Sequence, residues 1–301
     1  MAMNSRTQFP IGGADRTGGA NRKKTRKKVV FSIKILTLSA LTLYFVFPVA
    51  FMLLRSVMTE AEASSVPVAF FPQGFNYQSY VKIFREDYWL YTLNTLKIAL
   101  INIVTMVFTA SLSAYGFARI KFKGRGPLFA VMLATLMLPA AVSQIPLYVL
   151  YARFGWIDTH YPFIIPKMFG GGAINIFLII QFMRSVPKEL DEAAEIDGAG
   201  VFRRYVQITM PLCVPILIYI TVNIFNGAWG DFNTPKVFLQ TKSKFTLAMG
   251  IYYQSFLGGY QMAFSNLRMA AGVFMTVIPA ILFFVFQKRL VEGINIGAVK
   301  G

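Results

Sequence analysis

The sequence contains almost none of the residues from which metal centres and disulfide bonds are built. It has one cysteine, Cys213, and one histidine, His160, in 301 residues. A disulfide needs two cysteines, and a structural zinc site needs about four Cys or His ligands, so neither is predicted within this chain. Cys213 stands at an expected helix start, where we interpret it as a small apolar core residue rather than a nucleophile.

The motifs of common ATP-binding and hydrolytic sites are missing as well. The nearest approach to a phosphate-binding loop runs from Gly13 to Gly18, but Gly19 occupies the position of the required lysine. The sequence has no G-x-S-x-G and no H-E-x-x-H motif. We therefore expect a chain that is not an enzyme, and if ATP drives it, another polypeptide must hydrolyse that ATP.

Charged residues are also scarce. They make up 14% of the chain and hydrophobic residues 55%, where a soluble protein has about 25% charged residues. This balance is typical of a protein with several membrane spans. The formal net charge of +17 is compatible with nucleic-acid binding. However, the basic residues lie in stretches between apolar runs, as membrane topology signals do, so no nucleic acid is expected as a partner.

Six apolar segments have about the 20 residues that span a bilayer. They run from Ile33 to Leu54, Leu93 to Phe117, Pro127 to Tyr151, Pro162 to Met183, Leu212 to Trp229 and Met269 to Phe286. We therefore predict an all-α polytopic membrane protein with six transmembrane helices. Pro166, Lys167 and Gly170–Gly172 interrupt the fourth segment, which predicts a kinked or open entry to that span.

The distribution of basic residues predicts the orientation of the chain. With both termini in the cytoplasm, about two thirds of the Lys and Arg residues fall on the cytoplasmic side, as the positive-inside rule requires. The predicted organisation is a flexible basic tail (1–30), a first transmembrane helix (31–57), an outer loop (58–92), a five-helix core (93–290) and a cytoplasmic C-terminal tail (291–301). The core contains a cytoplasmic loop (185–211) and an outer loop (231–268).

Polar side chains within the six segments are mostly uncharged. Ion-coupled carriers usually bury carboxylates in their spans, and none occurs here, so an ion-coupled secondary transporter is the less favoured alternative. On the fifth segment Tyr219, Asn223 and Asn226 share one helix face. With Trp229 they form a candidate translocation path for a hydroxyl-rich solute such as a sugar. A stripe on the second segment, from Asn102 to Gly116, is interpreted as a helix-packing face.

The cytoplasmic loop 185–211 is the longest charged stretch of the core. Ser185 is expected to cap a helix over Lys188–Ile196, whose first turn is rich in acids, as the helix dipole favours. Gly198 is expected just past the helix end, in the left-handed conformation that other residues resist. A second helix is predicted over Val201–Ile208, and Pro211 opens the fifth span.

The spacing in this loop resembles the signature of the inner-membrane permease subunits of ABC importers. That signature reads Glu-Ala-Ala, three residues, Gly, nine residues, Ile, one residue, a hydrophobic residue and Pro. The matching residues are Glu192, Ala193, Ala194, Gly198, Ile208, Met210 and Pro211, with Met210 where Leu is usual. The run Ala114–Arg119 and the run Gln144–Pro146 resemble the carbohydrate-uptake branch, which includes the maltose permeases. The resemblance covers about residues 30 to 295.

The resemblance implies a type I importer permease bundle in a bacterial inner membrane. A sister permease subunit would complete the pore, and an ATPase dimer would bind ATP and Mg²⁺, which leaves this chain without a cofactor of its own. The motif residues would dock on one ATPase subunit, and the C-terminal tail could reach the ATPase dimer. A periplasmic or lipid-anchored solute-binding protein would deliver the carbohydrate from outside.

The outer loop 231–268 is the expected contact with that binding protein. Its middle, from Leu247 to Tyr260, is apolar and aromatic, so we expect it to insert partly into the membrane or to face a partner. Lys236, Lys242 and Lys244 are the candidate contacts. Because the outer loops are more basic than acidic, an acidic oligosaccharide such as alginate is one hypothesis for the substrate, with ordinary surface charge as the alternative.

Overall fold

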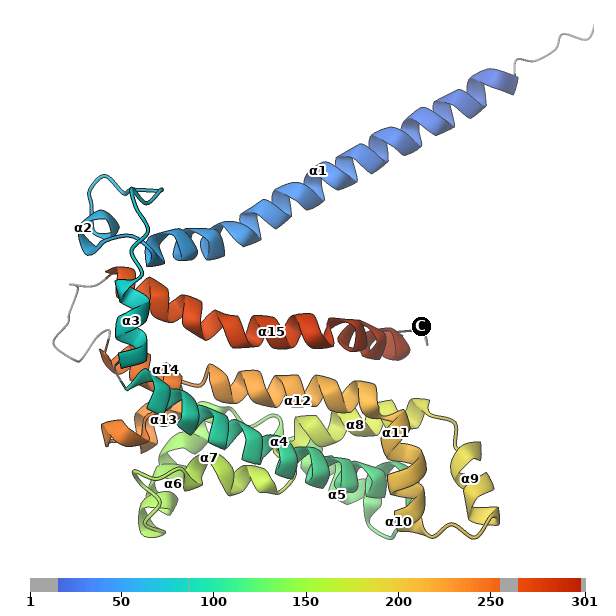
Figure 1. The fold of residues 1–301 in the computed structure, drawn as a ribbon. Coiled ribbons are helices and arrows are strands. Elements are labelled where there is room, and N and C mark those ends of the chain that lie inside the picture. Colours follow the sequence, from blue (N-terminus) through green and yellow to red (C-terminus); the bar gives the residue numbers. More distant parts are fainter. Residues whose placement is uncertain (1–15, 86, 255–264, 299–301) are drawn as a thin grey trace, which may run out of the picture. The chain divides into compact units, whose positions relative to one another are not determined.

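The computed structural model describes residues 16–85, 87–254 and 265–298, and every regular element in these ranges is helical (Figure 1). The predicted all-helical fold class is therefore confirmed for the described part of the chain. The chain divides into two compact units, Met1–Phe51 and Met52–Gly301.

The first helix, α1 (Arg16–Ser56), belongs for most of its length to the first unit. The elements that follow are α2 (Glu60–Ala63), α3 (Gln78–Arg85), α4 (Tyr88–Arg119), α5 (Arg125–Thr135), α6 (Ala140–Arg153), α7 (Tyr161–Ile164), η1 (Pro166–Met168), α8 (Ala173–Ser185), α9 (Glu189–Ile196), α10 (Val201–Arg204), η2 (Tyr205–Thr209), α11 (Met210–Leu212), α12 (Val214–Trp229), α13 (Asn233–Phe238), η3 (Lys242–Lys244), α14 (Leu247–Tyr252) and α15 (Ser265–Ala298). Of the short turns, η1 and η3 are 3₁₀-helical and η2 is π-helical.

Helix α1 begins earlier than the sequence predicts. Its stretch Lys28–Ser56 is long and apolar enough to cross a membrane, but the helix already starts at Arg16, inside the predicted flexible tail. Lys and Arg are good helix formers, so a helix nucleated in the apolar stretch extends into the basic run at residues 22–28 at little cost. Residues 1–15 lie outside the described residues. The predicted C-terminal tail is likewise helical as far as Ala298, where α15 ends.

Four helical stretches in the described residues have the length and hydropathy of a membrane span. They are Lys28–Ser56, Tyr88–Arg119, Tyr161–Ser185 and Asn266–Lys288, and they contain the first, second, fourth and sixth predicted segments. The fifth segment belongs to a bent pair, Val201–Leu212 and Val214–Trp229, with 77° between the two parts. Pro211 and Pro215 flank the bend, and each proline removes a backbone hydrogen bond from the turn before it.

The structure divides the third predicted segment, 127–151, between two helices that are each too short to span a bilayer alone. The two helices are α5 and α6, of 11 and 14 residues, with a break at residues 136–139. Pro139 is the N-cap of α6, and proline disfavours the helical conformation of the residue before it. The third of the six predicted transmembrane helices is therefore not present as one helix, and a crossing by this segment stays a prediction.

Helix α4 lies at the centre of the second unit. It packs against α8, α12 and α14, and α12 packs in turn against α15 (Figure 1). Small residues make these contacts close, since Ala99, Ala110 and Ala114 are fully buried along α4. Such residues let helices approach one another in a membrane, where dispersion contacts between helices replace the hydrophobic effect. One apolar cluster forms along the first half of α4 and a second along its second half.

Polar side chains of α4 form hydrogen bonds with the backbone of the broken span α7–η1–α8. Asn102 Nδ2 donates to the carbonyl oxygen of Phe163 (3.1 Å), and Thr109 Oγ1 accepts from the N–H of Gly170 (2.9 Å). The packing interpretation of the stripe on the second segment is confirmed at these two positions. The predicted interruption is also present, because Gly170–Gly172 have φ values of 88°, 63° and 101°, which glycine adopts without strain.

The apolar middle of the 231–268 loop folds back onto α4. The N–H of Leu247 donates to Thr95 Oγ1 (2.8 Å), and Leu247 is fully buried. A Cβ atom on Gly250 would lie 2.1 Å from the ring of Tyr91, so this glycine allows a close approach. Residues 247–250 are therefore covered by the chain's own helix, rather than by a membrane or a partner as the sequence suggested. Residues 255–264 lie outside the described residues.

Candidate functional site

The charged stretch 185–211, which we call the coupling segment, contains the predicted helix α9. Its first turn carries Glu189, Asp191 and Glu192, where acidic side chains suit the positive end of the helix dipole. The helix ends at Ile196, so the prediction of a helix over Lys188–Ile196 is confirmed, with Lys188 as its N-cap.

Ser185 does not cap α9, so that part of the prediction is wrong. Ser185 is the last residue of α8, and its Oγ donates to the carbonyl oxygen of Phe182 (2.7 Å). The side chain thus bonds backward to the preceding helix, a local alternative that serine hydroxyls often take.

Gly198 ends α9 in the left-handed conformation, with a φ of 79°. The N–H of Ala199 donates to the carbonyl oxygen of Ala194 (2.9 Å), and the N–H of Gly198 donates to that of Glu195 (3.0 Å). These two bonds form a Schellman motif, so the predicted left-handed conformation of Gly198 is confirmed. Gly200 differs, because it is the N-cap of α10 with an ordinary φ of −65°.

The second helix of the coupling segment is longer than the predicted Val201–Ile208. Elements α10, η2 and α11 follow one another from Val201 to Leu212, with a π turn in the middle. Single π turns within helices often occur at functional sites. Among the motif residues, Ile208 and Met210 are half-buried, and Pro211 is exposed in the first turn of α11.

The turn between α9 and α10 leaves apolar side chains exposed. Ile196 is 87% exposed and Phe202 is 66% exposed. Next to them on α9, Glu192 and Ala193 are exposed and Ala194 is half-buried. Large exposed apolar side chains are a feature of surfaces that bind another protein.

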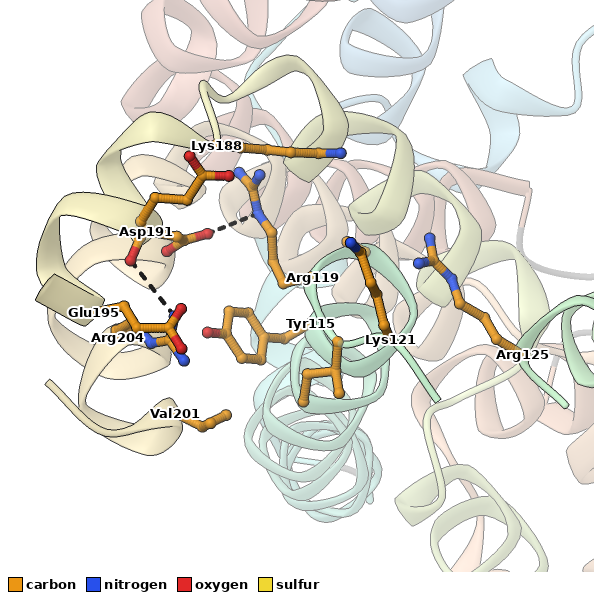
Figure 2. Close-up of a pocket in the computed structure, with 12 residues that line it drawn as sticks. Tyr115, Arg119, Lys121, Arg125, Lys188, Asp191, Glu195, Val201 and Arg204 are labelled. Atoms are coloured by element: carbon orange, nitrogen blue, oxygen red, sulfur yellow. Dashed lines mark hydrogen bonds and ion pairs between the residues drawn. The ribbon is translucent and has the colours of Figure 1, made fainter. Parts of the chain in front are cut away.

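Asp191 is the one buried residue of α9, and it contacts the end of α4 (Figure 2). Its Oδ2 lies 3.0 Å from Nε of Arg119, and Thr209 Oγ1 lies 3.3 Å from its Oδ1 as a donor. The Arg119 side chain is 6% exposed. Its Nη2 also donates to the carbonyl oxygens of Met183 (3.0 Å) and Val186 (2.9 Å), at the end of α8. One guanidinium group therefore connects α4, α8 and α9.

A cavity of about 440 Å³ lies beside this ion pair (Figure 2). It is lined by α9, α10 and the end of α4 with the loop that follows it, and its lining contains both basic and acidic side chains. Arg204 and Glu195 form a second ion pair at the cavity, and the Glu195 side chain is 65% exposed. In the described residues, no group of three or more His, Cys, Asp or Glu side chains could hold a metal ion.

Three of the four predicted path residues share an uncovered face of α12. Tyr219, Asn223 and Asn226 are exposed. Trp229 is 2% exposed instead, and its Nε1 donates to the carbonyl oxygen of Met275 in α15 (2.9 Å). The structure therefore brings the first three residues together and places Trp229 in the core.

The three lysines predicted to contact a partner have different surroundings. Lys244 is engaged within the chain, because its Nζ donates to Oδ2 (2.9 Å) and to the carbonyl oxygen (2.7 Å) of Asp158. Lys236 and Lys242 are exposed, with their ammonium groups over tyrosine rings at 5.3 and 4.9 Å from the ring centroids. Lys244 is also partly exposed, with 42% of its side chain accessible, but unlike the other two it forms an ion pair with Asp158.

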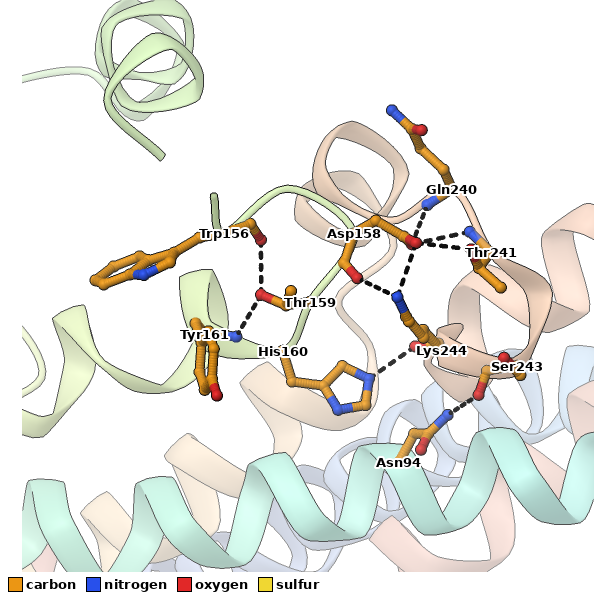
Figure 3. Close-up of polar contacts among 10 residues, drawn as sticks. All are labelled: Asn94, Trp156, Asp158, Thr159, His160, Tyr161, Gln240, Thr241, Ser243 and Lys244. Carbon is orange, nitrogen blue, oxygen red and sulfur yellow. Dashed lines mark hydrogen bonds and ion pairs between the residues drawn. The ribbon is translucent and has the colours of Figure 1, made fainter. Parts of the chain in front are cut away.

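Asp158 joins the loop after α6 to the loop before η3 (Figure 3). Its carboxylate accepts from the backbone N–H groups of Gln240 and Thr241 (both 2.9 Å) and from Thr241 Oγ1 (2.6 Å). Burial alone would raise the pKa of this carboxyl, but these donors and Lys244 hold the pKa well below its usual range. We call Asp158, Gln240, Thr241 and Lys244 the Asp158 clamp.

Sequence reasoning located the coupling segment but not the contacts that hold it in place. Arg119 directly follows an apolar span, and Asp191 lies next to the apolar side of α9, which includes Leu190 and Ala194. A charge that is buried in such a position needs a partner, because burial without one is costly. This signal indicates that each residue has a partner, but it does not identify the partner.

A sequence profile of one protein family matches residues 106–296. The family is described as the inner membrane component of binding-protein-dependent transport systems. The matched range includes the whole coupling segment, the exposed face of α12 and the Asp158 clamp.

Known proteins resemble the chain over most of its length. It is 31% identical over 284 residues to the putative ABC transporter permease protein ORF2 of Caldicellulosiruptor sp. (strain Rt8B.4), covering 93% of this chain and 98% of that protein. It is 31% identical over 243 residues to the galactooligosaccharides transport system permease protein GanQ of Bacillus subtilis, covering 79% and 85%. A solved structure of a bacterial ABC transporter, involved in the import of the acidic polysaccharide alginate, contains a chain with the same fold. That chain has a TM-score of 0.75 and 21% identity, with coverage of 87% of this chain and 97% of the other.

Proposed function

The chain belongs to the family of inner membrane components of binding-protein-dependent transport systems, and we propose that it forms part of the transmembrane path of a carbohydrate importer. Proteins of this family are permease subunits without catalytic activity, and a separate subunit hydrolyses ATP. The observation that carries the proposal is the family match over residues 106–296, which includes the coupling segment.

We propose that the turn between α9 and α10 docks in a cleft on an ATPase subunit. The docking residues are those of the motif: Glu192, Ala193, Ala194, Gly198, Ile208, Met210 and Pro211. The exposure of Ile196 and Phe202 supports this, since apolar side chains at a helix turn gain stability when a partner covers them. The ATPase dimer would hold ATP and Mg²⁺, and its closure would move this chain and a sister permease between inward-facing and outward-facing states.

The substrate class follows from the relatives and from α12. GanQ is named for galactooligosaccharides, and the exposed amides of Asn223 and Asn226, next to Tyr219, suit a solute rich in hydroxyl groups. A solute-binding protein would dock at the opposite end from the coupling segment, near Lys236 and Lys242. An acidic saccharide is a weaker hypothesis than a neutral one. Of the three lysines that would favour an acidic sugar, Lys244 is already paired with Asp158.

We also propose that the chain crosses an inner membrane six times with both termini in the cytoplasm. Helices α5 and α6 together would provide the third crossing. Their combined length, with the break at Pro139 facing protein or water, is enough for a bilayer. The excess of basic residues in the tail before the first span and in the loop after α4 supports this orientation.

The test is isolation of the whole complex from membranes. An ATPase and a solute-binding protein should co-isolate with the wild-type chain, and uptake of the sugar found on that binding protein should stop with vanadate. An Ile196→Asp variant should lose most of the ATPase, because a buried carboxylate opposes docking. Comparing neutral and acidic oligosaccharides in the same assay identifies the sugar class. Uptake that continues with vanadate and needs only a proton gradient would favour the ion-coupled carrier instead.

A further inference from the structure

Helix α9 is fixed to the rest of the chain mainly by polar contacts. Its apolar side chains point away from the core, since Leu190 is 46% exposed and Ile196 is 87% exposed. The residue that it buries is Asp191, whose side chain is only 11% exposed. A short helix of 8 residues has little intrinsic stability, so its position depends on such tertiary contacts.

The partner of Asp191 is attached to two long helices at once. Arg119 is the last residue of α4, and its guanidinium group also binds the carbonyl oxygens of Met183 and Val186 at the end of α8. On the other side, Thr209 of η2 binds the second carboxylate oxygen of Asp191. Any displacement of α9 therefore acts on the ends of α4 and α8 through one ion pair, and on the start of α12 through η2.

We propose that the Arg119–Asp191 pair is the joint through which the docked coupling helix moves the transmembrane helices. Arg119 and Asp191 are then positioning residues for transport, and this inference rests on the proposed function. The pair suits the task because an arginine fork holds several acceptors in fixed directions, whereas apolar contacts can slide.

The cavity beside the pair supports a turning movement of α9 about the ion pair, rather than a movement of α9 as one rigid body with α4. A helix that turns relative to its neighbours needs free space beside it, and this pocket, which is partly open to the surface, provides such space. Here about 440 Å³ separates parts of α9 and α10 from the end of α4, and Asp191 and Arg119 line this space. The ion pair is thus a fixed point, and the cavity gives the helix room to turn about it.

The second ion pair of the segment provides a matched control. Glu195 lies one turn after Asp191 on the same helix and pairs with Arg204, but its side chain is 65% exposed. The Arg204 side chain is 14% exposed, but water screens the exposed carboxylate, so this pair contributes less than one in which both partners are buried. Glu195→Gln removes the same charge from the same helix and leaves both side chains of the Arg119–Asp191 pair unchanged.

The decisive measurement is sugar uptake per ATP hydrolysed by the whole complex, with the loaded binding protein present. For Asp191→Asn we expect this ratio to fall by about tenfold or more, because one partner of a buried pair is lost. The amount of ATPase that co-isolates should stay within about twofold of wild type, because the exposed docking face is unchanged. Glu195→Gln should keep both values near wild type.

Conservative variants test whether the Arg119–Asp191 pair transmits motion or only stabilises the fold. Asp191→Glu keeps the carboxylate and should restore most of the ratio. Arg119→Lys keeps the charge but not the fork, so it should lower the ratio. If Asp191→Asn fails to reach the membrane, Arg119→Lys decides the question in the same assay.

Two results would contradict the proposal that this pair is the joint. One is a wild-type ratio in both Asp191→Asn and Arg119→Lys. The other is a loss of uptake that only follows the loss of assembled complex, with the ratio unchanged. Failure of the proposed function looks different, because the wild-type chain would then co-isolate with no ATPase.

Discussion

At the turn between α9 and α10, Gly198 holds a backbone conformation that side chains with a Cβ atom resist. Apart from Gly198 and its two neighbours in sequence, no atom of the described residues lies within 4 Å of a Cβ placed there, so the need for glycine comes from the backbone conformation and not from lack of space. The left-handed conformation, with a φ of 79°, costs about 1–2 kcal/mol in residues other than glycine. A valine at this position would therefore unwind the end of α9 or change the direction of α10.

We predict that Gly198→Val lowers uptake per hydrolysed ATP by roughly tenfold, because a penalty of about 1.4 kcal/mol shifts a conformational equilibrium by that factor. Gly200→Val is the matched control, since Gly200 also has open space around it but an ordinary φ of −65°. Uptake and ATP hydrolysis in vesicles measure both variants. Equal losses in the two variants would show that bulk, rather than backbone conformation, matters at this turn.

The conformation of a residue such as Gly198 can be predicted from the sequence, because it is determined by the residues next to it in the chain. A glycine that follows a helical run by two residues is enough to predict a Schellman turn. Ser185 shows the limit, since a serine can cap the next helix or bond back to its own, and local sequence does not decide between them. The Asp191–Arg119 contact is beyond such reasoning, because its two residues lie far apart in the chain.

At the scale of elements, the Asp158 clamp fixes two loops that are distant in sequence. We predict that Asp158→Asn lowers the unfolding free energy by about 1–3 kcal/mol, because Lys244 loses its counter-charge and the backbone donors lose an ionised acceptor. Thermal unfolding of the purified protein measures the change. Asp87→Asn is the control, since Asp87 is an exposed acid at the start of α4 whose side chain forms no cap.

The pH dependence of this difference has a definite sign. The pKa of Asp158 is held well below its usual range, so its stabilising effect is complete above the unfolded value of about 4. The gap in stability between wild type and Asp158→Asn should therefore be constant from about pH 5 to pH 8, and should shrink only as the pH falls below about 4. A gap that changes near neutral pH would point to another titrating group.

At this scale, the sequence predicts a helix correctly where the length of an apolar run is sufficient evidence for it. The spans within α1, α4 and α15 follow from runs that only a membrane or a core can cover. The break before α6 and the 77° bend before α12 depend on how prolines are accommodated by neighbouring helices, which a hydropathy pattern does not contain. Trp229 was expected on the translocation path but is buried for a similar reason. Its hydrogen-bond partner, the carbonyl oxygen of Met275, belongs to another helix, and the local sequence does not reveal that contact.

At the scale of the whole second unit, α4 connects the two regions for which we propose functions. At its first end, Asn94 Nδ2 donates to the carbonyl oxygens of Ser243 (2.9 Å) and Phe245 (3.0 Å), next to the Asp158 clamp. At its last residue, Arg119 meets the coupling segment. A single helix of 32 residues thus contacts both regions, so a displacement of α9 would be passed along α4 to the loop that we propose faces the binding protein.

The number of membrane crossings decides whether those two regions lie on opposite sides. Cys213 is fully buried, so a Cys213→Ala background allows single cysteines at three exposed positions: Gln73, Lys123 and Lys242. With six spans, a membrane-impermeant maleimide should label Gln73→Cys and Lys242→Cys in intact cells, and Lys123→Cys only after permeabilisation. Three crossings separate Lys123 from Lys242 if α5 and α6 together form a span, but only two if they do not. Labelling of Lys123→Cys and Lys242→Cys from the same side would therefore exclude the third crossing.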